Sequence, residues 1–124
     1  MGTYANDKLV MLYFQTGDGV NDGADEGYAA PLKNFRGFRF IADTDAIEMQ
    51  FDSMLGTGAD IAAVDKVVLN ITAAKQHLVI ADITAAINGL KYGDGFVTIA
   101  DDATGTYVSS NITTCGAITV TAAA

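Results

Sequence analysis

Apolar and polar residues alternate along two segments in the middle of this chain. In each segment every second side chain is large and apolar, and most side chains between them are polar. The apolar positions are Ile47, Met49 and Phe51 in the first segment and Val67, Leu69 and Ile71 in the second. Successive side chains of a β-strand point to opposite faces of a sheet, so this period of two predicts two strands, each with one buried and one solvated face.

Other segments share the composition of strands, because they are rich in β-branched, aromatic and other apolar residues. They are residues 8–14, 35–41, 96–100, 107–112 and 115–121. The polar turn Asp43-Thr44-Asp45 separates residues 35–41 from the alternating segment at 46–52, which predicts a hairpin. The chain is therefore expected to contain about six or seven strands.

A period of three to four residues replaces the alternation between residues 75 and 89. Ile80, Ile83 and Ile87 recur at these steps, which predicts an amphipathic helix with one apolar stripe. Thr72 is placed to cap the first turn of this helix, and Gly89 is suited to end it in a left-handed conformation. We expect one helix over about residues 75–89.

Glycine and acidic residues break both periods in residues 15–34, which predicts a long, exposed acidic loop. A loop of this length in a small domain is usually functional or ordered by a partner. Residues 18–26 cluster the carboxylates that calcium prefers, but the EF-hand spacing fails at Val20 and Ala29. A solvated loop is therefore favoured, with a small calcium- or ligand-binding module as an alternative.

These elements predict an α+β fold, in which a mostly antiparallel sheet packs against the one helix. The chain has 124 residues, half of them hydrophobic, and this is enough to bury a core without disulfide bonds. We expect a single domain that spans residues 1–124.

The net charge of −8, from 7 basic and 15 acidic residues, disfavours contact with nucleic acid and with anionic membranes. No secretory leader and no apolar run of membrane-spanning length is visible, so we expect a soluble protein made in the cytoplasm.

The chain offers little for catalysis or cofactor binding. Cys115 and His77 are its only cysteine and histidine, and they lie far apart in sequence. Asp101 and Asp102 are adjacent, as expected for a turn rather than for an acid–base pair. No phosphate-binding loop and no Gly-x-Ser-x-Gly motif occurs. We expect no enzymatic activity, no cofactor and no metal.

Two segments are candidates for contact with a partner. Residues 8–14 are too uniformly apolar for an exposed edge strand, so a second subunit is expected to cover them. Residues 33–40 interleave cations with phenylalanines. They form either a contact face for an acidic partner or part of the core with arginines toward solvent. The interface candidates are Leu9, Met11, Tyr13, Phe14, Lys33, Phe35, Arg36 and Arg39.

A longer pattern runs through the second half of the chain. It consists of the strand Val67 to Thr72, a helix end Ala86-Ile87-Asn88, the segment Gly95 to Asp102 and the turn Gly105-Thr106-Tyr107. Across residues 36–121 this pattern resembles small virion structural proteins of tailed bacteriophages, including marine ones. The acidic loop is not part of the resemblance.

The resemblance implies a non-catalytic virion protein, made in the host cytoplasm and present in many copies. We expect a capsid decoration or cement protein that binds the major capsid protein, stabilises the head and associates with itself. A tail or neck protein of the virion is the alternative within this class.

Overall fold

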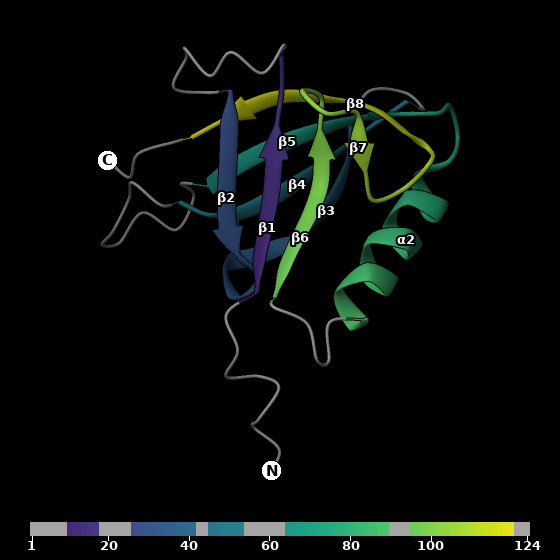
Figure 1. Cartoon of the computed structure of the whole chain (residues 1–124). Helices are drawn as coiled ribbons and strands as arrows, with labels where there is room; N and C mark the ends of the chain where they lie inside the picture. Colours follow the sequence, from purple (N-terminus) through teal and green to yellow (C-terminus); the bar gives the residue numbers. More distant parts are fainter. Residues whose placement is uncertain (1–9, 18–25, 42–44, 54–63, 90–94, 121–124) are drawn as a thin grey trace.

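The computed structural model describes residues 10–17, 26–41, 45–53, 64–89 and 95–120 (Figure 1). Eight strands, one α-helix and a short 3-10 turn lie in these residues. The strands are β1 (Met11–Gln15), β2 (Gly27–Pro31), β3 (Phe35–Ile41), β4 (Ala46–Asp52), β5 (Val64–Ile71), β6 (Phe96–Asp101), β7 (Thr106–Tyr107) and β8 (Ile112–Thr119). The 3-10 turn η1 is Leu32–Asn34, and the helix α2 is Gln76–Asn88. The expected α+β class is confirmed, with one strand more than the upper expectation.

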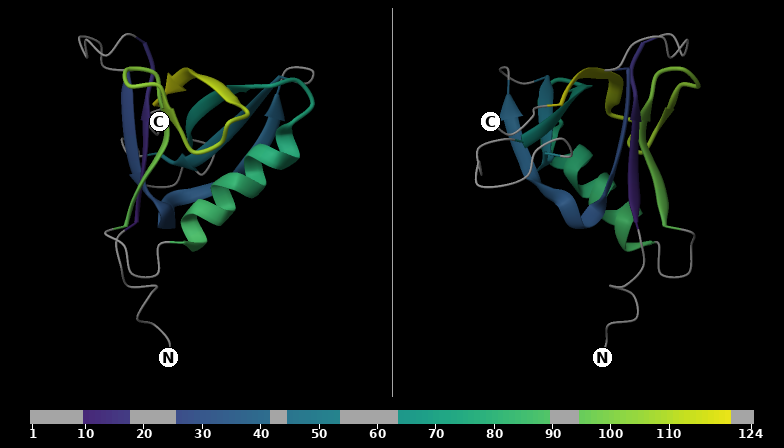
Figure 2. Two further views of the ribbon diagram at one scale, coloured as in Figure 1. Left: turned by 45° about the vertical axis from the view of Figure 1, so that its right-hand side comes forward. Right: turned by 90° about the vertical axis from the view of Figure 1, so that its left-hand side faces the viewer.

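The strands form two four-stranded sheets that pack against each other. Sheet A has the order β2-β1-β6-β7, and sheet B has the order β3-β4-β5-β8. Neighbouring strands are antiparallel except for β1 and β6, which are parallel. Figure 1 shows sheet A in front, with its strands running across those of sheet B behind it. Helix α2 closes one side of this arrangement, next to β6 (Figure 2).

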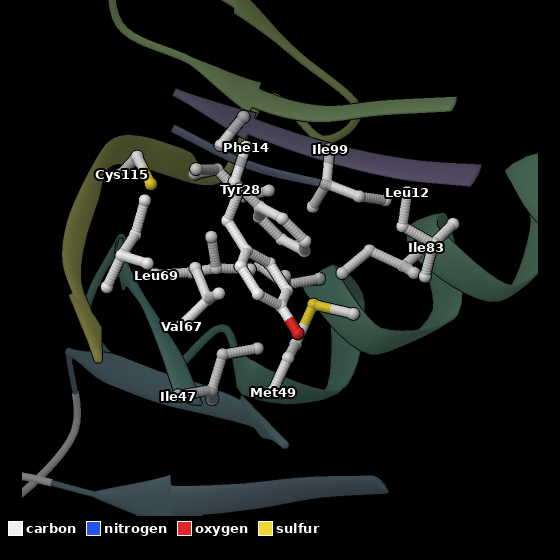
Figure 3. Close-up of a cluster of buried hydrophobic side chains, with 14 of the residues drawn as sticks. Leu12, Phe14, Tyr28, Ile47, Met49, Val67, Leu69, Ile83, Ile99 and Cys115 are labelled. Atoms are coloured by element: carbon white, nitrogen blue, oxygen red, sulfur yellow. The ribbon is translucent and has the colours of Figure 1, made fainter. Parts of the chain in front are cut away.

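The core consists of the side chains that the two sheets direct toward each other (Figure 3). Phe14 of sheet A and Met49 and Leu69 of sheet B have no exposed surface. The Phe51 ring lies between the sheets, with its centroid 5.8 Å from that of Phe14 and 5.5 Å from that of Tyr28. The alternation seen in the sequence therefore places its apolar residues inward, as predicted for both segments.

Helix α2 contributes two fully buried side chains, Val79 and Ile83, to this core. Its ends differ from the prediction. Thr72 lies in the preceding turn, where its carbonyl accepts a hydrogen bond from the Lys75 N–H, and the helix begins after Lys75 without a side-chain cap. Gly89 has a φ of −76°, so it is not left-handed. The described part of the chain contains no helix that could span a membrane.

The second half of the predicted 15–34 loop is not a loop. Residues 27–31 form β2, which pairs with β1, and residues 32–34 form η1. Tyr28 and Ala30 are buried and alternate with more exposed neighbours, but alanine, glycine and proline hide this period in the sequence. Residues 18–25 lie outside the described part of the chain.

Asp102 joins the two sheets at one corner of the fold. Its N–H donates to the Gln15 carbonyl of β1 (2.9 Å). Its Oδ1 accepts from the Tyr107 hydroxyl (2.7 Å) and from the Cys115 N–H of β8 (2.9 Å). The Thr16 hydroxyl donates to the Cys115 carbonyl (2.9 Å). Asp102 and Thr16 thus bond to backbone groups at the ends of β1 and in β8, and these bonds hold the two sheets together at this corner.

We expect Phe51→Ala to lower the free energy of unfolding by about 3–5 kcal/mol, because it removes a wholly buried ring from between the sheets. Phe40→Ala is the matched control. Phe40 lies on the neighbouring strand β3 but is 60% exposed, so its loss should change stability by about 0.5 kcal/mol or less. Urea denaturation of both variants measures the difference. Equal effects would contradict this account of the core.

Candidate interaction surfaces

The outer face of sheet A carries no charged side chain among six neighbouring positions. Strand pairing places these positions side by side on the face opposite the core. They are Met11, Tyr13, Ala29, Pro31, Phe96 and Thr98, which we call the uncharged face. No described helix or strand covers this face, which points toward the viewer in Figure 1. This face is therefore suited to an apolar contact with another molecule, although the chain as a whole carries a net charge of −8.

Two aromatic rings lie close together on the uncharged face. The centroids of Tyr13 and Phe96 are 5.8 Å apart, and Phe96 is 50% exposed. The Tyr13 hydroxyl donates to Oε1 of Gln15 (3.0 Å), and Gln15 in turn donates to the Thr16 carbonyl (3.0 Å). Desolvation, together with the nearby Asp101 carboxylate, raises the Tyr13 pKa above its usual value. The ring contact and the Tyr13 hydrogen bond thus orient Tyr13 and Phe96 before any partner binds, which lowers the entropic cost of binding.

The outer face of sheet B has the opposite chemistry. Nη1 of Arg39 lies 3.6 Å from Oε2 of Glu48, and Nε of Arg36 lies 3.5 Å from Oδ1 of Asp52. Glu48 also accepts a hydrogen bond from Gln50 and is 5% exposed. Its carboxylate is therefore buried beneath neighbouring side chains, and Arg39 partly compensates its charge.

A bulge in β3 brings the two arginines to the same face. Residues three apart in a regular strand point to opposite faces. Between Phe35 and Gly37 the register with β4 shifts by one residue, so Arg36 and Arg39 both reach carboxylates on the outer face of β4. Bulges re-aim side chains in this way.

The structure divides the interface candidates of the N-terminal segment. Met11 and Tyr13 lie on the uncharged face. Phe14 points the other way and has no exposed surface, because it alternates with Tyr13, so it belongs to the core and is removed from the candidate interface. Leu9 lies outside the described residues.

The candidates of the second segment lie around the start of sheet B. Lys33, Arg36 and Arg39 are exposed. Phe35 is partly buried, with its ring centroid 5.1 Å from that of Phe38 and 5.4 Å from that of Phe51. The phenylalanine therefore packs on the core while the cations face solvent. Arg36 and Arg39 lie on sheet B and the uncharged face lies on sheet A, while Lys33 lies in η1 between the two sheets.

One polar contact inside the core was not predicted from the sequence. The Tyr28 hydroxyl of sheet A donates to Oδ2 of Asp65 on sheet B (2.8 Å), and Asp65 has no exposed surface. Burial, followed by the bond to Asp65, raises the Tyr28 pKa. The available signal was the position of Asp65, which lies in phase with the inward residues Val67 and Leu69.

His77 and Cys115, the candidates for nucleophilic chemistry, lie on different elements, α2 and β8. Most of the candidate calcium loop, at 18–25, lies outside the described residues, and no cluster of three metal-ligating side chains occurs within them. His77 is exposed on α2. Cys115 is buried, and desolvation followed by the nearby carboxylates of Asp102 and Asp101 raises its pKa to about 12. The neutral thiol of Cys115 is therefore a packing group at neutral pH.

Comparison with known protein families, with curated proteins and with solved structures found no match to this chain.

We expect the stability of the protein to fall as the pH rises from about 9 to about 12, partly because of Cys115. The pKa is 9.0 for an ordinary thiol and about 12 in the fold, so within this range the unfolded state releases a proton that the folded state retains. The unfolded state is then favoured by up to about 1.4 kcal/mol per pH unit.

Denaturation of the wild type and of Cys115→Ala across this range checks the expectation. The variant should show a shallower fall, whatever its stability at neutral pH. The remaining slope includes Tyr107, whose pKa the hydrogen bond to Asp102 raises to about 12. Parallel curves for the two proteins would contradict the assignment.

Proposed function

We propose that this chain is a non-catalytic structural protein of a phage virion, and that it binds the major capsid protein as a decoration or cement protein. The uncharged face of sheet A is the observation that carries the proposal. The resemblance across residues 36–121 to small virion proteins of tailed phages supports the same class.

The chemistry of the uncharged face suits attachment to another folded protein. Specific interfaces have an apolar centre enriched in aromatic residues and methionine, with a polar rim. Met11, Tyr13 and Phe96 supply such a centre. Asp101, partly exposed at the end of β6, supplies a polar group at its margin. Aromatic anchors of this kind usually contribute most of the binding free energy.

Attachment through this face would strengthen the shell by linkage. A protein that binds only the assembled capsid stabilises it in proportion to the logarithm of its concentration relative to the dissociation constant. Sheet A would then face the capsid, and the charged outer face of sheet B would point away from it. Self-association of the chain stays a prediction from the sequence.

Phe96→Asp tests the proposal. The substitution places a charge at the exposed aromatic centre, and we expect it to weaken binding to capsids stripped of this protein by about tenfold or more, consistent with a loss of at least 1.4 kcal/mol. Leu78→Asp is the matched control, since Leu78 is 44% exposed but lies on α2. Co-sedimentation measures binding, and the melting temperature of the capsid reports the added stability.

Equal binding by both variants, with both folded, would contradict the use of the uncharged face. Quantitative mass spectrometry of purified particles tests the wider proposal. Hundreds of copies per particle, in order of magnitude, indicate a decoration protein, and about a dozen indicate the neck or tail. Absence of the protein from the particles would overturn the virion assignment.

A further inference from the structure

The four outermost strands of the two sheets differ in how they protect their edges. A strand that ends a sheet exposes backbone donors and acceptors that can pair with another extended chain. Strand β2 is short and ends at Pro31, which has no N–H to donate. Strand β7 has two residues. Neither offers a long template for an added strand.

Strand β8 is protected by irregularity and by capping. Its pairing with β5 shifts register twice, once opposite Val67 to Leu69 and once opposite Asn70 to Ile71. The N–H and carbonyl of Cys115, between these shifts, already bond to Asp102 and Thr16. Bulges and capped backbone groups both discourage further pairing.

Strand β3 is the other long outermost strand, and its one bulge, between Phe35 and Gly37, leaves Gly37 to Ile41 in regular register with β4. It has seven residues, and each is at least partly exposed. In the described part of the chain it pairs with β4 alone. Phe40 at its far end is 60% exposed. Because neither short length nor proline blocks pairing along this edge, the side chains of β3 must determine which extended segment can add to it.

The charges of β3 and the adjoining turn select the added strand. Lys33, Arg36 and Arg39 account for three of the seven basic residues of the chain. The β3 bulge turns both arginines to one face, where they pair with Asp52 and Glu48 while their side chains keep 40% and 62% of their surface exposed. Side chains on adjacent strands interact directly, favourably for opposite charges and unfavourably for like ones. A second copy of β3 would bring arginines toward arginines, whereas a strand with alternating carboxylates would bring acids toward them.

We propose that the outer edge of β3 binds an extended acidic segment of a partner protein, which adds to sheet B as a fifth strand. Backbone hydrogen bonds supply the affinity, and the two arginines select for carboxylates on the outward positions of the segment. This surface is separate from the uncharged face, and the inference does not depend on the capsid assignment.

A short capped peptide of alternating valine and glutamate tests the inference. Two-dimensional NMR at low ionic strength gives its affinity, and amide hydrogen exchange locates it. We expect added protection on residues 35–41, because new backbone bonds form there. Arg36→Gln should weaken binding by about twofold to fivefold, the range for one exposed ion pair. Lys75→Gln is the matched control, because it removes one exposed positive charge at the start of α2.

Two control peptides separate strand addition from simple charge attraction. The same peptide N-methylated at alternate residues keeps its charges but loses donors, and it should bind more weakly. Replacing glutamate by lysine should abolish binding. Overturning results are no binding of the acidic peptide, binding without protection of β3, equal binding of the N-methylated peptide, or equal losses for Arg36→Gln and Lys75→Gln. Protein that dimerises through β3 without peptide would also overturn the proposal, since a second copy would then be the occupant.

Discussion

The packing of sheet A on sheet B is the constraint on which the rest of the structure depends. Each strand can direct only alternate side chains into the space between the sheets. Phe14, Met49 and Leu69 use these positions, and helix α2 fills the open side with Val79 and Ile83. Once the inner faces are committed to the core, any contact with another molecule must use outer faces, edges or loops.

The sequence predicts elements well where large apolar residues alternate with polar ones. Strands β4 and β5 meet this condition, and in α2 the apolar residues recur every three to four residues, as a helix requires. Strand β2 does not, because alanine, glycine and proline carry almost no hydrophobic signal even though Tyr28 and Ala30 are buried. When a buried side chain is small, the sequence does not indicate which face of the strand it occupies.

The candidate surfaces were less accessible from sequence because each depends on contacts between distant segments. Tyr13 and Phe96 become neighbours only through the parallel pairing of β1 with β6. Arg36 and Arg39 reach one face only because β3 is bulged, a feature that composition does not encode. The buried pair of Tyr28 and Asp65 likewise needs both sheets in place. The sequence therefore supplied candidate residues, and strand pairing decided which of them share a surface.

The central claim is that the uncharged face of sheet A is covered in the particle. Hydroxyl-radical footprinting of the free protein and of intact virions tests it directly, because methionine, tyrosine and phenylalanine react readily when exposed. We expect Met11, Tyr13 and Phe96 to be labelled in the free protein and protected in the virion, while Leu78 on α2 stays equally reactive in both. Unchanged labelling of Phe96 and Tyr13 in virions that contain the protein would contradict the claim.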